Sequence, residues 1–260
     1  MTKDLRVSLV QFNIVWENPD KNLSLLDSLL LKASPDTDLI ILPEMFNTGF
    51  TMATETLAET MDGPTVQWMQ QKAKEFHTSV MGSLIIKDKD KIFNRLLCCA
   101  ADGIINYYDK RHLFRIAGED KKYTPGNQRR IIRIKDWKIL PLICYDIRFP
   151  VWSRVNENEY DIIVYVANWP QFRNQHWEIL LKARAIENQA FAIGVNRTGR
   201  DENHIDYAGN SMVVHPKGQM LCNLEDKQSI NTCVLSRKEL DDYREKFPVW
   251  KDRDRFEIRG

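Results

Sequence analysis

Asp38-Leu39-Ile40-Ile41-Leu42-Pro43-Glu44 is the stretch that decides the fold class. Residues 39–42 are continuously apolar, which is typical of a short strand covered on both faces by other layers, and the proline ends it. Helical patterns lie on both sides: leucines recur at helical spacing from Pro19 to Lys32, and Asp62-Gly63-Pro64 opens a second helix to about Phe76. A buried strand between two helices predicts an α/β fold.

Strand and helix patterns alternate along the rest of the chain. Apolar runs and alternation predict strands at 5–12, 79–86, 92–101, 104–108, 131–134, 139–144, 160–167, 191–196, 211–215 and 230–235. Helices are predicted at 174–188 and, after the capping box Ser236-Arg237-Lys238-Glu239, to about residue 246. We find no internal repeat and no linker, so we expect a single domain over residues 1–260 with a polar tail at about 247–260. The segment 109–129 has no clear periodicity, and loops of that length are often functional.

The composition is that of a globular protein. The 260 residues carry 37 Lys plus Arg against 36 Asp plus Glu, a net charge of +1, and 43% are hydrophobic. This balance argues against a disordered chain and against a nucleic-acid binder, which needs a basic excess. No apolar run approaches the ~20 residues of a membrane span, and the N-terminus has no apolar signal region. We therefore expect a cytoplasmic protein without membrane contact.

The cysteines and the absent motifs narrow the chemistry. The five cysteines are odd in number and have no C-x-x-C spacing, so we expect reduced thiols at Cys98, Cys99, Cys144, Cys222 and Cys233. Phosphate-binding and dinucleotide-binding glycine motifs are missing, as is the G-x-S-x-G serine motif. The histidines have no zinc-site spacing. We expect no metal and no organic cofactor.

Three predicted strands end in reactive side chains. Glu44 follows the strand at 39–42, Lys110 follows the strand at 104–108, and Cys144 follows the run Leu140-Pro141-Leu142-Ile143. Taken singly, a glutamate after a proline is usually a turn residue, a loop lysine is usually solvated, and a cysteine after a strand is usually core. Catalytic groups, however, often lie where a rigid strand meets a loop, so the three side chains can converge if the strands are neighbours.

The chemistry of these three groups is complementary. A thiol attacks a carbonyl carbon as a thiolate, which a neighbouring ammonium favours and a carboxylate can form by taking the proton. The Lys110 ammonium and the backbone N–H of Tyr145 can stabilise the oxyanion, and Glu44 can pass a proton to a leaving amine and later activate water. This pattern favours hydrolysis through a covalent intermediate.

The segments around these residues resemble the carbon–nitrogen hydrolase (nitrilase) superfamily over roughly residues 5–250. The resemblance rests on four segments in family order: Leu42-Pro43-Glu44-Met45-Phe46, Tyr108-Asp109-Lys110-Arg111-His112-Leu113-Phe114, Cys144-Tyr145-Asp146-Ile147-Arg148-Phe149-Pro150 and Arg184-Ala185-Ile186-Glu187-Asn188-Gln189. It implies a four-layer α-β-β-α sandwich, a triad of Glu44, Lys110 and Cys144, no cofactor, and a homodimer with helices such as 174–188 at the interface. A second family glutamate matches Glu119, which we expect to position Lys110 or the substrate.

Within that superfamily the chain is most similar to bacterial omega-amidases, which act on the terminal amide of 2-oxoglutaramate. The resemblance therefore implies amide hydrolysis through a thioester, with a small carboxylated amide as substrate. We expect Tyr145, Asn168, Trp169 and Arg173 to contact that substrate. Arg148 is the other candidate for its carboxylate, but we favour an ion pair with Asp146 or Glu187, because a buried arginine is normally paired.

Three alternatives stay open. The chain can be an N-carbamoyl-amine hydrolase or a nitrilase of the same superfamily. It can also be a non-catalytic interaction protein that keeps the fold, although the triad residue types are intact. A Cys–His thiol hydrolase that uses His176, which is 32 residues after Cys144, is the last alternative.

Overall fold

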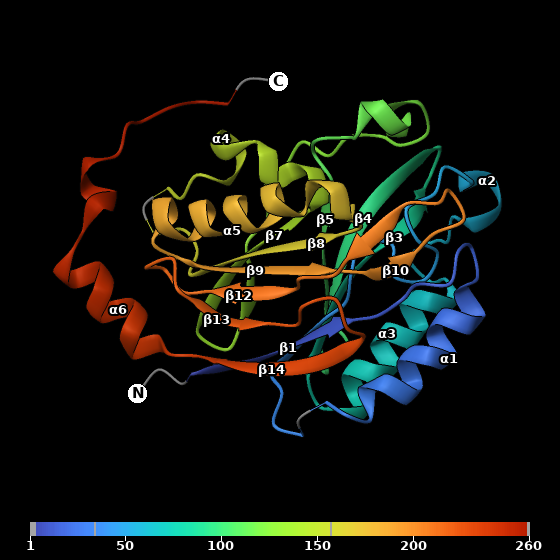
Figure 1. Ribbon diagram of the computed structural model, residues 1–260, viewed down its shortest axis with the longest axis horizontal. Coiled ribbons are helices and arrows are strands. Elements are labelled where there is room, and N and C mark those ends of the chain that lie inside the picture. The colour runs from blue at the N-terminus through green and yellow to red at the C-terminus, as the bar shows by residue number, and fades with distance from the viewer. Residues whose placement is uncertain (1–3, 34, 157, 259–260) are drawn as a thin grey trace.

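Two six-stranded sheets stacked face to face form the centre of the computed structural model, which describes residues 4–33, 35–156 and 158–258 (Figure 1). The first sheet has the order β14-β1-β2-β3-β4-β5, with β14 (Ser229–Leu235), β1 (Leu5–Gln11), β2 (Leu39–Ile41), β3 (Ser79–Asp88), β4 (Lys91–Cys99) and β5 (Ile105–Asp109). The second has the order β13-β12-β9-β8-β7-β6, with β13 (Met220–Asn223), β12 (Met212–Val214), β9 (Phe191–Asn196), β8 (Ile162–Ala167), β7 (Trp137–Ile143) and β6 (Ile132–Ile134). A hairpin of β10 (Thr198–Arg200) and β11 (Asp206–Ala208) stands apart from both.

Each sheet has three parallel strands at its centre and antiparallel strands outside them. The parallel sets are β1, β2 and β3 in one sheet and β7, β8 and β9 in the other. Parallel neighbours need crossover connections, and helices supply several of them. These helices are α1 (Pro19–Leu30) and α3 (Pro64–Glu75) for the first sheet and α5 (Asn174–Asn188) for the second.

The hydrophobic core is layered. Val7, Leu9 and Ile41 of the first sheet share one cluster with Leu140 and Leu142 of the second, so the sheets bury their facing surfaces against each other. A second cluster lies on the outer face of the first sheet, where α1 and α3 pack, and α5 covers the outer face of the second. The order helix, sheet, sheet, helix is the expected four-layer sandwich, and that prediction is confirmed (Figure 1).

The predicted elements largely coincide with the observed ones. The helix at 174–188 and the strand at 191–196 have the predicted bounds, and the Ser236 side chain caps α6 (Arg237–Lys246) by accepting from the Glu239 N–H at 3.4 Å. The pattern missed β10, β11 and β13 and two one-turn helices, α2 (Thr54–Leu57) and α4 (Pro150–Ser153). The long loop contains two 3₁₀ turns, Arg115–Ala117 and Glu119–Lys121, and further 3₁₀ turns are Cys144–Arg148, Gln171–Arg173 and Val249–Asp252.

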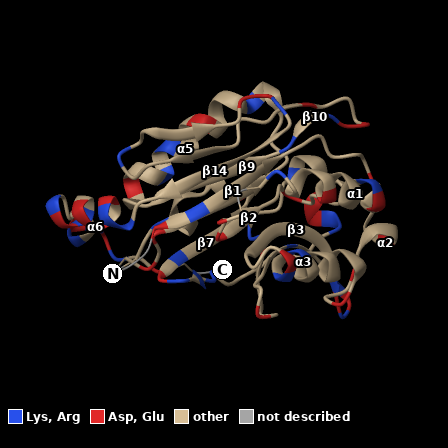
Figure 2. Cartoon of the chain, turned by 90° about the horizontal axis from the view of Figure 1, so that it is seen from below, with Lys and Arg blue, Asp and Glu red and all other residues tan. Residues whose placement is uncertain are grey.

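Most charged residues lie outside the sheets, although strands such as β1 and β7 carry one each, Arg6 and Lys138. Figure 2 shows Lys, Arg, Asp and Glu on helices such as α6 and at loop ends, whereas β2 and β9 carry none. Among the residues that the structure describes, no helix is long and apolar enough to cross a membrane.

Candidate active site

Glu44, Lys110 and Cys144 meet at one end of the stacked sheets. They follow β2, β5 and β7 respectively, whose carboxyl ends lie at the same end of the sandwich. Nζ of Lys110 lies 2.9 Å from Oε1 of Glu44, and all three side chains line one cavity of about 760 Å³. The convergence expected of three strand ends agrees with this geometry.

Lys110 is a fully buried ammonium between two buried carboxylates. Besides Glu44, it contacts both oxygens of Glu119 at 3.0 Å. Burial alone would lower the pKa of Lys110, but Glu119 and Glu44 outweigh that effect and the pKa is raised. The lysine therefore stays protonated and supplies a fixed positive charge beside Cys144.

Glu119 lies behind Lys110. It is not among the described residues that line the cavity, and Oε2 accepts a 2.5 Å hydrogen bond from the Phe114 N–H. Burial raises the pKa of Glu119, with Lys110 opposing the effect. We expected Glu119 to position either Lys110 or the substrate. From this position it contacts Lys110 directly.

Cys144 begins a tight turn. Its φ of 43° lies in the left-handed region, which a residue with a β-carbon adopts only under strain. The 3₁₀ turn Cys144–Arg148 starts here, and Oδ2 of Asp146 accepts from the Ile143 N–H at 3.0 Å. The turn leaves the thiol partly exposed at the cavity, although the strand before it is buried.

The surroundings of Cys144 raise the pKa of its thiol. Burial, the charge of Glu44 and hydrogen bonding to Glu44 all raise the pKa of Cys144, while Lys110 lowers it and is outweighed.

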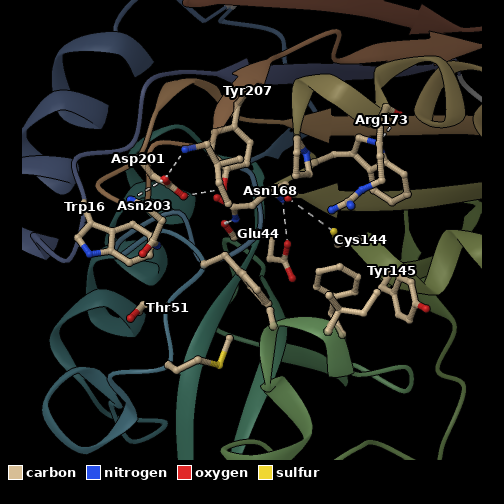
Figure 3. Close-up of a pocket in the computed structure, with 18 of the residues that line it drawn as sticks. Trp16, Glu44, Thr51, Cys144, Tyr145, Asn168, Arg173, Asp201, Asn203 and Tyr207 are labelled. Carbon is tan, nitrogen blue, oxygen red and sulfur yellow. Dashed lines mark hydrogen bonds between the residues drawn. The ribbon is translucent and has the colours of Figure 1, made fainter.

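Asn168 connects Glu44 to the sulfur of Cys144. Its backbone N–H donates to Oε2 of Glu44 at 2.9 Å and its side-chain amide donates to the Glu44 carbonyl at 2.5 Å. The sulfur lies 4.0 Å from the Asn168 carbonyl oxygen, so Glu44, Asn168 and Cys144 face one another across the cavity floor (Figure 3). The predicted residue Asn168 is thus at the site.

The same cavity is lined by three further residues that the sequence analysis predicted, Trp169, Arg173 and Tyr145. The Trp169 indole N–H donates to the Arg173 carbonyl at 2.7 Å, which fixes the ring against the loop. The Arg173 guanidinium lies over the Phe114 ring at 5.3 Å, and the Arg148 guanidinium lies over Trp169 at 4.9 Å.

The ion pair expected for Arg148 is wrong. Glu187 pairs with Arg184 at 2.9 Å, and Asp146 bonds Tyr108 and His112 instead. Within the described part of the chain neither Arg148 nor Arg173 has a carboxylate within 4 Å, and both line the cavity. Burial and the neighbouring Arg148 charge lower the pKa of Arg173.

His176 does not serve Cys144. Its ring is exposed and lies 3.0 Å from the Arg148 guanidinium, and no contact between His176 and Cys144 occurs in the ranges that the structure describes. The Cys–His alternative is therefore contradicted.

Several lining residues escaped the sequence analysis. Phe50 and Met52 also line the cavity. Trp16 and Tyr207 line it together with the polar residues Thr51, Asp201 and Asn203 (Figure 3). Asn94, fully buried on β4, donates to Glu44 and Glu119. A polar residue within the apolar run 92–99 was the signal that could have found it, because buried amides need partners.

A family model described as carbon-nitrogen hydrolase matches residues 6–245. The chain is 43% identical to the omega-amidase YafV of Escherichia coli over 98% of both chains. It is 31% identical to the 2-oxoglutaramate amidase of Bacillus subtilis over 95% of this chain and 96% of that one. Among solved structures it is similar to XC1258 from Xanthomonas campestris, a CN-hydrolase superfamily protein with an arsenic adduct in the active site. The TM-score is 0.96 and the identity 40%, over 98% of this chain and 99% of the other.

Proposed function

The chain belongs to the carbon–nitrogen hydrolase family, and from that premise we propose that this amidase releases ammonia from the terminal amide of a small dicarboxylic acid monoamide such as 2-oxoglutaramate. The names of two relatives, an omega-amidase and a 2-oxoglutaramate amidase, support this substrate class. One observation carries it: Arg148 and Arg173 face the cavity of Cys144, and within the described residues neither has a carboxylate partner.

We propose Cys144 as the nucleophile, Glu44 as the proton carrier and Lys110 as the electrostatic partner. Glu44 takes the thiol proton as the sulfur bonds to the amide carbon. The resulting oxyanion is stabilised by the Lys110 ammonium and by the N–H of Tyr145, which lies in the first turn of a 3₁₀ helix and has no intrahelical partner. The raised pKa of Cys144 supports this order, since the proton is still on sulfur when the substrate arrives.

The second half of the reaction is hydrolysis of a thioester. Glu44 gives its proton to the departing amine, the carbon–nitrogen bond breaks, and ammonia leaves. Glu44 then removes a proton from water, the hydroxide adds to the thioester carbon, and the sulfur leaves to recover the proton from Glu44. Each of these roles is worth on the order of 10² or more in rate.

The carboxylate of the substrate, in this proposal, lies between Arg148 and Arg173. Arginine binds carboxylates through two parallel N–H bonds, and two arginines repel each other until an anion sits between them. The aromatic faces of Phe114 and Trp169 already hold the guanidiniums in place, so little side-chain entropy is lost on binding.

Ammonia release from 2-oxoglutaramate, succinamate, glutamine and an N-carbamoyl amine tests the function, with wild type and Cys144→Ala in parallel. We expect turnover of the first two amides by wild type and none by the variant. Carbon dioxide from the carbamoyl amine would indicate an N-carbamoyl-amine hydrolase, and turnover of a nitrile without amide preference would indicate a nitrilase. No hydrolysis of any substrate, or full activity of Cys144→Ala, contradicts the proposal.

We also propose a homodimer. Ile179 and Ile186 of α5 and Phe172 just before it are at least half exposed, and burying such a patch in a symmetric interface would stabilise a pair of chains. Sedimentation of wild type and Ile179→Glu tests this: we expect a dimer and a monomer, and a monomeric wild type would overturn it.

A further inference from the structure

Asn94 contacts both carboxylates behind the cavity floor with its side chain and the backbone of Lys110 with its own backbone. Its side-chain nitrogen donates to Oε1 of Glu44 at 2.8 Å and to Oε1 of Glu119 at 3.2 Å. Its backbone carbonyl accepts from the N–H of Lys110 at 3.0 Å. Asn94 therefore joins the lysine and both glutamates through one residue.

The position on β4 explains how one residue does this. Side chains alternate across a strand, so Asn94 points to the site while Arg95 turns to the opposite face. There Arg95 pairs with Asp109, at the end of β5, with N–O distances of 2.6 and 3.1 Å. β4 also bonds the backbone of Lys110 and pairs with β3 and β5 on its two sides, and Asn94 is fully buried there.

Two carboxylates share two donors here. Oε1 of Glu44 and Oε1 of Glu119 each receive one bond from Lys110 and one from Asn94. The formal charge of this cluster is −1, because the second donor is a neutral amide. A second cation in its place would neutralise both carboxylates, and the base would lose its driving force to accept a proton.

The amide also decides which oxygen of Glu44 faces the chemistry. Lys110 and Asn94 occupy Oε1, so the remaining oxygen, Oε2, lies on the side of Asn168, whose carbonyl is 4.0 Å from the Cys144 sulfur. Without Asn94, the carboxylate would keep one donor on each oxygen, Lys110 on Oε1 and the Asn168 N–H on Oε2. The Asn94 amide adds a second bond to Oε1 and so further restricts rotation about the last bond of Glu44.

We propose that Asn94 is a positioning residue that fixes Oε1 of Glu44 and Oε1 of Glu119 and thereby presents Oε2 of Glu44 to the Cys144 thiol. This inference rests on the proposed function, in which Glu44 carries the proton. Asn94 does not line the cavity among the described residues, so its effect belongs to kcat and not to KM.

Two nearly isosteric variants test the role. Asn94→Leu removes both donors, and Asn94→Asp adds a third carboxylate to the cluster, which disfavours the charged form of its neighbours. In folded protein we expect kcat to fall at least tenfold with KM within threefold. We also expect the acid limb of the kcat/KM profile to move to higher pH in both variants, further in Asn94→Asp.

Further titratable groups face Glu44 and contribute to the charge around it. They are Lys110 after β5, Glu119 and Tyr123 from the long loop, Cys144 after β7 and Tyr207 of β11. Only the two carboxylates titrate on the acid side, so the acid limb reports on the pair that Asn94 holds. Asn188→Leu is the matched control, since Asn188 is also a buried, hydrogen-bonded asparagine but lies in α5. We expect it to lower stability and leave the acid limb in place.

A measurement without turnover separates this inference from the function. We expect the pH dependence of Cys144 alkylation by iodoacetamide, followed by mass spectrometry, to contain an acid-side inflection from the carboxylates that Asn94 contacts, whether or not an amide is hydrolysed. We expect Asn94→Asp to move that inflection to higher pH. If wild type hydrolyses no amide but the inflection moves, the function fails and the positioning role stands. An unmoved acid limb and inflection, with kcat within threefold of wild type in either folded variant, overturn it.

Discussion

The hydroxyl of Tyr108 donates a 2.8 Å hydrogen bond to Oδ2 of Asp146, and this contact ties the strand before Lys110 to the turn that carries Cys144. The two segments come from different sheets, so no backbone pairing sets the distance between them. Asp146 is fully buried, and its carboxylate is the direct link. The spacing of amine and sulfur therefore depends on a residue that takes no part in the chemistry.

Asp146→Asn is expected to lower both stability and rate. Besides Tyr108, the carboxylate accepts from the N–H groups of Ile143 and His112, each at 3.0 Å. An amide cannot accept at both ends, so one buried donor faces an NH₂ group, which costs about 3 kcal/mol. Urea unfolding gives the stability, and we expect kcat to fall about tenfold or more. A loss below about 0.5 kcal/mol, the scale of an exposed control such as Asp120→Asn, would contradict the argument.

Local sequence patterns gave the elements but not the contacts between distant segments. The helix α5 and the strand β9 follow from continuous periodicity, whereas β10 and β11 are three residues each and include Gly199, Arg200 and Asp206, which carry no strand signal. The strand ends located Glu44, Lys110 and Cys144, because reactive residues after apolar runs are visible in one dimension.

The hydrogen-bond and ion-pair partners of polar side chains could not be predicted from local sequence patterns. Arg148 has Asp146 two residues away, and the natural inference of an ion pair fails because that carboxylate is taken by Tyr108 and His112, which are more than 30 residues distant. Asn94 likewise contacts Glu44 across 50 residues of chain. Such contacts depend on how the sheets stack, which residue spacing does not encode.

Glu44→Gln is expected to abolish turnover and at the same time make the thiol more acidic. The charge of Glu44 is among the causes that raise the pKa of Cys144, so a neutral amide lowers that pKa, while Lys110 continues to favour the thiolate. Loss of the proton carrier should reduce kcat by about 10²–10⁴. The pH dependence of Cys144 alkylation should shift to lower pH.

Unchanged turnover by Glu44→Gln, together with a shift of Cys144 alkylation to higher pH, would contradict this role for Glu44. If Glu44 instead formed a resting thiolate, the variant would alkylate more slowly than wild type at a given pH. Glu245→Gln, an exposed glutamate of α6, is the control for a general change of charge. We expect it to leave both the alkylation profile and kcat unaltered.

Cys233 is expected to react before Cys144 with a limiting amount of iodoacetamide at neutral pH. A hydrogen bond from Cys222 lowers the pKa of Cys233, whereas burial raises the pKa of Cys98, Cys99 and Cys144. The thiolate is the reactive form, so Cys233 should be labelled first. Peptide mapping identifies the first labelled site. Cys222→Ala should slow labelling of Cys233, and prior labelling of Cys144 would refute the ordering.

The arginine pair is expected to set substrate preference. Truncating Arg173 or Arg148 to Met removes a charged hydrogen bond to the substrate carboxylate, worth about 1.5–3 kcal/mol, or roughly 10- to 150-fold in kcat/KM. The loss should fall on KM for 2-oxoglutaramate and succinamate. A neutral amide such as butyramide has no carboxylate, so its kcat/KM should change less than threefold.

Lysine at these positions separates charge from geometry. Arg173→Lys keeps the positive charge but loses the paired N–H bonds and the stacking on Phe114, so it should recover only part of the affinity that Arg173→Met loses. The double variant of Arg148 and Arg173 should lose less than the sum of the two single changes, because one carboxylate binds both and the neighbours are coupled. Equal losses for the neutral and the carboxylated amides would show that the arginines support the fold of the cavity wall and do not recognise the substrate. A loss in only one of the two single variants would place the carboxylate on that arginine alone, and strict additivity would contradict a shared carboxylate.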